Sequence, residues 1–153
     1  MLTKPSLVAL LIALAACGGA LAQDEPRVDN SGKGAVLCLQ QVLLSAKAVV
    51  EACGWERTST DDAIDNALTD IDAFVIANSS QPVTQEQINQ FKSEQLDDAR
   101  AHISAEPGVY SRDPKASDDG LFWAIHTMDV TEFVALTADA LSIPREPVLN
   151  PCF

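Results

Sequence analysis

Four segments of the chain carry apolar side chains at intervals of three and four residues, and this pattern limits the fold more than any other feature. The segments span about residues 33–53, 59–77, 84–105 and 119–142. Each would bury one stripe of its surface as an amphipathic α-helix, and no segment alternates convincingly as a strand does. Because four such stripes bury one another when helices pack side by side, the sequence predicts an all-α, four-helix bundle-like single domain.

Local sequence marks where these helices begin and end. Thr84 and Gln87 have the spacing of a capping box, and Val83 and Ile88 occupy the positions of a hydrophobic staple. The third helix should therefore begin at this point. Pro144 ends the fourth helix, and the proline-rich residues from about 143 onward predict an extended C-terminal tail.

The first 22 residues have the parts of an export leader. Lys4 is their only charge, and the apolar run of residues 6–16 is about half the length of a membrane-spanning helix. Cleavage after Ala22 would remove residues 1–22 as an ordinary signal peptide. The sequence Leu-Ala-Ala-Cys that ends at Cys17 resembles the lipobox of bacterial lipoproteins. We favour the second reading, in which residues 1–16 are removed and Cys17 is lipidated, with residues 23–32 as a polar tether before the helical domain of residues 33–153.

Three cysteines remain whichever cleavage occurs, so at most one intramolecular disulfide forms. Cys38 and Cys53 are 15 positions apart on one predicted helix, which places them roughly 22 Å apart. A disulfide needs Cα atoms within about 7 Å, so these two cannot pair. We expect Cys53 to pair with Cys152, because Cys53 ends its helix and the tail can reach it without entering the core. The alternative is a Cys38–Cys152 bridge.

The charge balance excludes several classes of partner. The chain has 22 acidic and 10 basic residues, and loss of a leader containing Lys4 changes the net charge from −12 to −13. Such a surface repels phosphate backbones and anionic lipid headgroups, so we expect no nucleic-acid binding. Membrane attachment would occur only through a lipid anchor at Cys17. We expect a protein partner, and a basic one would be attracted to this surface.

Two polar stripes are predicted to face solvent. On the first helix the polar residues at positions 33, 40, 47 and 51 share one side. On the second helix an acidic run lacks the spacing and central glycine of a calcium-binding loop. We therefore interpret that run, which consists of Asp61, Asp62, Asp65, Asp70 and Asp72, as a solvated helix face.

No catalytic or cofactor motif occurs in the sequence. The motifs sought were those of thioredoxin-type redox pairs, covalent haem, zinc proteases, serine hydrolases, nucleotide phosphates and di-iron carboxylates. We predict no enzymatic activity, no cofactor and no metal site. The one candidate ligand site is His126 with Asp129, because His126 falls in an apolar arc and Asp129 follows one helical turn later.

These observations favour an exported, non-catalytic helical protein of a bacterial envelope, namely a lipoprotein-type accessory, assembly or protein-binding module. The export leader, the tether and the acidic surface support this expectation. Two alternatives remain open. One is a periplasmic carrier of a small ligand or metal that uses the bundle interior near His126. The other is an enzyme inhibitor or immunity protein that acts on a basic partner.

Overall fold

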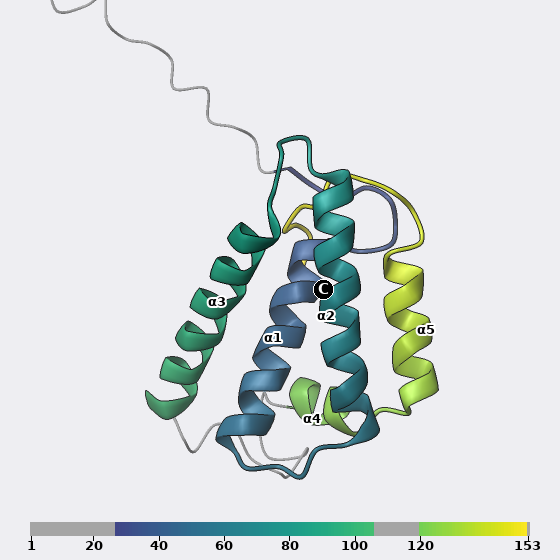
Figure 1. Cartoon of the computed structure of the whole chain (residues 1–153). Helices are drawn as coiled ribbons and strands as arrows, with labels where there is room; N and C mark the ends of the chain where they lie inside the picture. The colour runs from purple at the N-terminus through teal and green to yellow at the C-terminus, as the bar shows by residue number, and fades with distance from the viewer. Residues whose placement is uncertain (1–26, 106–119, 153) are drawn as a thin grey trace, which may run out of the picture.

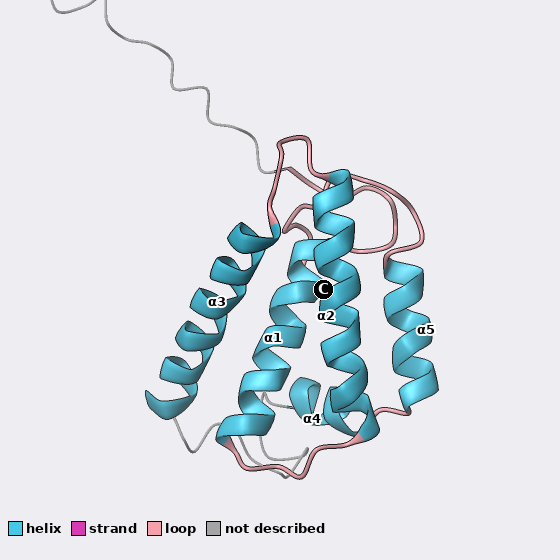
Figure 2. Cartoon of the chain, in the orientation of Figure 1, coloured by secondary structure: helices cyan, strands magenta, loops and turns pink. Residues whose placement is uncertain are grey.

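The structure, a computed structural model, describes residues 27–105 and 120–152 (Figure 1). The predicted leader, Cys17, residues 23–26 of the tether and residues 106–119 lie outside the described residues. The described part is all-helical, with one isolated bridge and no strands (Figure 2), so the predicted all-α, bundle-like fold is confirmed. Its five helices are α1 (Val36–Ala52), α2 (Ser59–Asn78), α3 (Gln85–Ala105), α4 (Gly120–Thr127) and α5 (Val130–Ala140).

α1 is the central helix of the bundle. It lies between α2 and α3 in Figure 1, and α4 packs across the ends of α1 and α2. α5 packs against α2. The side chains of Leu43, Ile64 and Ile71 are almost fully buried between these helices, and each contributes about 1.5–3 kcal/mol through removal of apolar surface from water. None of the described helices combines the length and hydrophobicity that a membrane span needs.

The segment predicted as one helix over residues 119–142 is two helices. The backbone of Asp129 is extended, with φ −60° and ψ 131°, and its carboxylate accepts hydrogen bonds from the backbone N–H groups of Thr131 at 2.9 Å and Glu132 at 3.2 Å. Asp129 is therefore the N-cap of α5. A capping carboxylate competes with helix continuation, which is why α4 ends at Thr127 although the apolar periodicity continues.

The predicted helix starts are close to the observed ones. The Thr84–Gln87 capping box is confirmed, because the Thr84 backbone N–H donates to Gln87 Oε1 at 2.9 Å and the Gln87 N–H donates to Thr84 Oγ1 at 3.3 Å. α2 has a capping box as well, formed by Thr58 and Asp61. The N-cap of α2 is thus one residue before the predicted start at Ser59.

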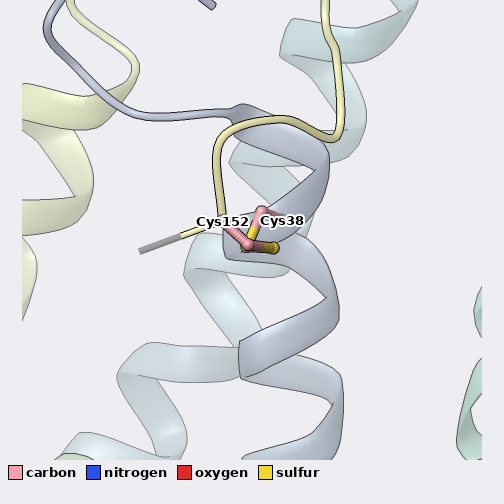
Figure 3. Close-up of a disulfide and its surroundings, with 2 residues drawn as sticks. All are labelled: Cys38 and Cys152. Carbon is pink, nitrogen blue, oxygen red and sulfur yellow. A yellow bond between two sulfur atoms is a disulfide. The ribbon is translucent and has the colours of Figure 1, made fainter. Parts of the chain in front are cut away.

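The C-terminal tail is tied to the beginning of α1 and not to its end. Cys152 is bonded to Cys38, with their Cα atoms 5.4 Å apart (Figure 3), so the favoured Cys53–Cys152 pairing was wrong. The tail runs beside the first turn of α1, where the carbonyl of Val148 accepts a hydrogen bond from the Leu37 N–H at 3.1 Å. Cys53 lies at the opposite end of α1, where it packs beside Trp55. The tail does not extend that far.

Residues 27–32, predicted as part of a free tether, pack against the tail. Val28 pairs with Asn150 in a single parallel bridge, and the Asp29 N–H donates to the Asn150 carbonyl at 2.7 Å. Arg145 Nε donates to Asp29 Oδ2 at 2.5 Å. We call this contact between residues 27–32 and 145–150 the terminal clasp. It extends the folded domain six residues before its predicted start at residue 33.

Candidate functional site

An apolar groove opens between the first half of α1, α4 and α5, and we call it the α1–α5 groove. Its volume is about 360 Å³. The walls come from five parts of the chain: the turn before α1, α1 itself, α4, the turn between α4 and α5, and α5. Large apolar side chains line most of it, among them Leu39, Val42, Leu43, Ile125, Phe133 and Leu136.

α5 contributes both large and small side chains to the groove. α5 buries only Phe133 and Thr137, and its lining ends in the small side chain of Ala140. Leu121 of α4 and Leu136 of α5 line the groove and remain 52% and 55% exposed. Large apolar side chains that border a concave apolar site and stay in contact with water are a common feature of ligand-binding surfaces.

One ion pair lies at the groove, formed by the only charged residues among the described residues that line it. Lys33 Nζ donates to Asp139 Oδ1 at 2.5 Å. The Lys33 side chain is 27% exposed and that of Asp139 is 64% exposed. Lys33 is therefore the more enclosed partner, whereas Asp139 faces water at the end of α5.

His126 does not form the predicted pair with Asp129. Its ring is buried, and Nδ1 lies 3.0 Å from Oδ2 and 3.1 Å from Oδ1 of Asp61 on α2. The rings of Trp55 and Trp123 pack beside it, with centroids 5.1 and 5.4 Å away. The Asp129 carboxylate instead caps α5. His126 and Ile125 are neighbours on α4, but only Ile125 lines the groove.

The predicted solvated acidic face is only partly correct, because Asp61 and Asp72 are buried. Asp72 accepts hydrogen bonds from Gln40 Nε2 at 3.2 Å and Gln85 Nε2 at 3.1 Å, and it also pairs with Lys92. The carboxylate thereby joins α1, α2 and α3. Gln40, predicted on the solvent side of the first helix, is likewise buried.

The buried acids do not form a metal centre. Within residues 27–105 and 120–152, no group of three or more His, Cys, Asp or Glu side chains could hold a metal ion. Asp61 has partners in His126 and the Thr58 N–H, and Asp72 in two amides and an ammonium. Such satisfied buried carboxylates position helices, which is a structural role.

Sequence reasoning missed the groove because its walls are separated by up to about 100 residues and no local pattern joins them. Comparison with known proteins adds no family to this picture. No protein-family model matches the chain, and no curated protein or solved structure matches it.

Proposed function

We propose that this chain is a non-catalytic binding protein that holds a small apolar molecule in the α1–α5 groove. The observation that carries the proposal is the groove itself. It is a concave site with a volume of about 360 Å³, mostly apolar walls and one ion pair among its described lining residues. Small-molecule sites typically occupy about 300–1,000 Å³, with mostly apolar walls and few polar groups. Of the functions considered from the sequence, the small-ligand carrier is the one that this geometry favours.

The volume limits the size of the molecule. At roughly 30 Å³ per heavy atom, the share of volume of a water molecule in the liquid, the groove holds about 12 heavy atoms. A chain of about ten carbons or a fused pair of aromatic rings is of this size. The proposal is for binding and not for catalysis, because the buried His126–Asp61 pair faces the tryptophan cluster rather than the groove.

The proposed location is the bacterial envelope, with the protein attached through a lipidated Cys17 or soluble after cleavage behind Ala22. The leader pattern supports export. The Cys38–Cys152 bridge supports it independently, because structural disulfides persist mainly in oxidising compartments. A carrier in that compartment would meet its ligand outside the cytoplasm.

A protein-binding module is the second candidate, and the exposed apolar residues around the groove favour it. Val134 and Leu136 on α5 and Leu121 on α4 are each at least half exposed. A partner protein would insert an apolar side chain into the groove rather than leave it for a small molecule. The acidic surface would attract a basic partner of this kind, whether a component of an assembly or an inhibited enzyme.

The test uses 1-decanol, an uncharged molecule of suitable size, in calorimetric titration of the purified full chain. We expect saturable binding of one decanol per chain. Ala140→Trp should weaken decanol binding at least tenfold, because Ala140 lines the groove and the larger indole would occupy the space of the ligand. Ala138→Trp is the matched control, because Ala138 lies on the same helix, is exposed and does not line the groove.

Two results would contradict a small-ligand carrier. One is the absence of decanol binding by the unaltered chain. The other is equal weakening by both tryptophan variants at unchanged helical content, which would mean that decanol does not bind in the groove that Ala140 lines. Circular dichroism of both variants monitors the helical content, so that loss of folding is recognised.

A further inference from the structure

Within the proposed carrier function, the α1–α5 groove has chemically distinct parts. Its walls are apolar, and its two charged groups are Lys33 and Asp139, which are bonded to each other. A ligand that fills the groove and also has a charged end group can replace one member of this pair. The question is which member is replaceable.

The difference in exposure indicates that Asp139 is the replaceable member. Its side chain is 64% exposed, whereas that of Lys33 is 27% exposed. Asp139 can return to water at little cost, because exposed ion pairs contribute only about 0–1 kcal/mol. Lys33 without a partner would leave a more enclosed ammonium unpaired, which is costly. A ligand that supplies a new carboxylate to Lys33 avoids that cost.

The backbone around Lys33 is held in place before any ligand arrives. The Lys33 N–H donates to Ser31 Oγ at 3.1 Å, and the carbonyl of Gly34 accepts from Arg145 Nη2 at 2.7 Å. Gly34 has a φ of 79°, a conformation that glycine adopts without strain. The terminal clasp thus fixes the position from which the lysine extends, and a pre-positioned group loses less entropy on binding.

The start of α1 adds to the attraction of an anion at this end of the groove. Gly34, Ala35 and Val36 line the groove, and the first turn of α1 contains no acidic side chain. The N-cap residue Ala35 makes no side-chain capping bond. The Leu37 N–H is already bonded to the Val148 carbonyl, and the remaining partial positive charge of the helix N-terminus acts together with the Lys33 ammonium on a nearby anionic group.

We infer that the groove binds a free carboxylic acid of about ten carbons, with its carboxylate on Lys33 in place of Asp139 and its apolar part along the apolar walls. The inference rests on the proposed function, since it assigns the ligand class of the same groove. A cationic amphiphile is the competing occupant, because it would displace Lys33 and bind Asp139.

The experiment compares decanoate, 1-decanol and decyltrimethylammonium at submicellar concentrations by calorimetric titration of the full chain. These molecules share a chain length and differ in end group. We expect decanoate to bind at least tenfold more tightly than decanol. Lys33→Gln should reduce the affinity for decanoate to the affinity that the same variant has for decanol. Asp139→Asn should raise decanoate affinity several-fold, because it weakens the competing carboxylate.

Lys47→Gln is the matched control. Lys47 has nearly the same exposure as Lys33 and is also paired with an aspartate, Asp65, but it does not line the groove. This variant should leave the ratio of decanoate to decanol affinity unchanged. Thermal unfolding of each variant shows whether a change in affinity follows from a change in stability.

The outcomes separate this inference from the proposed function. Equal affinities for decanoate and decanol would overturn the carboxylate inference and leave the carrier function in place. Tighter binding of decyltrimethylammonium, abolished by Asp139→Asn, would overturn it in favour of a cationic ligand. A decanoate preference that persists in Lys33→Gln would overturn the role of Lys33. Failure of both decanol and decanoate to bind would overturn the carrier function itself.

Discussion

His126 and Asp61 show how a buried polar pair is stabilised at the scale of single residues. The imidazole packs beside the rings of Trp55 and Trp123, which also contact each other, and the Asp61 carboxylate accepts a further hydrogen bond from the Thr58 N–H at 2.7 Å. Burial of either group alone would be unfavourable, whereas burial of the bonded pair leaves both satisfied. The pair joins α4 to the N-terminal turn of α2.

His126→Ala should therefore lower stability without removing ligand binding. The substitution leaves a cavity and removes one partner from the buried Asp61, so we expect a loss of about 2–4 kcal/mol in the free energy of unfolding. Chemical denaturation measures this loss, and decanol titration below the unfolding transition measures binding. His102→Ala on the exposed part of α3 is the control, with an expected change within about 0.5 kcal/mol. Loss of decanol binding in a folded His126→Ala variant would assign the histidine to the site.

Asp29 in the terminal clasp should make stability depend on pH in the acidic range. Burial acts to raise the pKa of Asp29, but hydrogen bonds from Ser31 and Arg145 outweigh it and hold the pKa below the ordinary 3.8. A carboxyl whose pKa is lower in the folded chain contributes stability above its unfolded pKa. That contribution is lost as the pH falls from about 4 through the lowered pKa.

The corresponding test is urea unfolding of Asp29→Asn and the unaltered chain at pH 7 and at pH 3 or below. At pH 7 we expect the variant to be less stable by about 1–3 kcal/mol, the range for hydrogen bonds to charged groups. At the acidic pH the gap should narrow, because the wild-type carboxyl becomes protonated. Asp70→Asn, at an exposed position of α2, should behave like the unaltered chain. A stability difference of the same size at both pH values would show that protonation of Asp29 is not linked to unfolding.

At the scale of helices, the break between α4 and α5 is the element that creates the groove. A single helix over this segment would continue in one direction. The turn at Met128 and Asp129 instead redirects the chain, and Thr60 Oγ1 of α2 donates to the Met128 carbonyl at 2.7 Å to hold it. α4 and α5 can then line the groove from different directions.

Asp129→Ala tests the cap of α5. The alanine cannot accept the two backbone hydrogen bonds that the carboxylate accepts, so we expect a loss of about 1 kcal/mol, within the usual range of about 0.5–2 for N-caps. Asp129→Ser or Asn should restore most of the loss. Asp98→Ala, in the interior of α3, is the control and should change the unfolding free energy by less than about 0.5 kcal/mol. An unchanged midpoint of urea unfolding in Asp129→Ala would show that α5 does not need its cap.

At the scale of the whole molecule, the two ends of the domain are joined twice. The terminal clasp joins residues 27–32 to the tail, and the Cys38–Cys152 bridge joins the tail to α1 across a sequence separation of 114. In the chain-entropy model a closed loop of this length stabilises the fold by about 4–5 kcal/mol. The tail thereby keeps Lys33 and the start of α1 in position.

Cys152→Ser should lower the free energy of unfolding by an amount approaching about 4–5 kcal/mol. A reducing agent should lower the stability of the unaltered chain to the same level and have no further effect on the variant. Cys53→Ser should have a smaller effect and keep the sensitivity to reductant. A Cys53→Ser chain that becomes insensitive to reductant would show that Cys53 takes part in the bridge instead.

The sequence by itself determined the all-α class, the boundaries of α2 and α3 and the absence of a Cys38–Cys53 bridge. These follow from periodicity, capping spacing and helix rise, which are local properties of the chain. Aspartate at position 129 is also a common N-cap residue, but the apolar stripe that continues through this position favoured a single helix. The burial of Gln40, Asp61 and Asp72 could not be predicted from the sequence. A polar side chain enters a core only when another helix supplies its partner.

Only the tertiary structure decided which cysteine the tail reaches, what His126 pairs with and where a ligand could lie. Each depends on distances between segments far apart in sequence. The tail passes the first turn of α1 because the clasp with residues 27–32 holds it there. The groove arises because α5 packs on α2 and leaves space beside α1. The packing of whole helices sets these distances, and they cannot be predicted from the periodicity of a single helix.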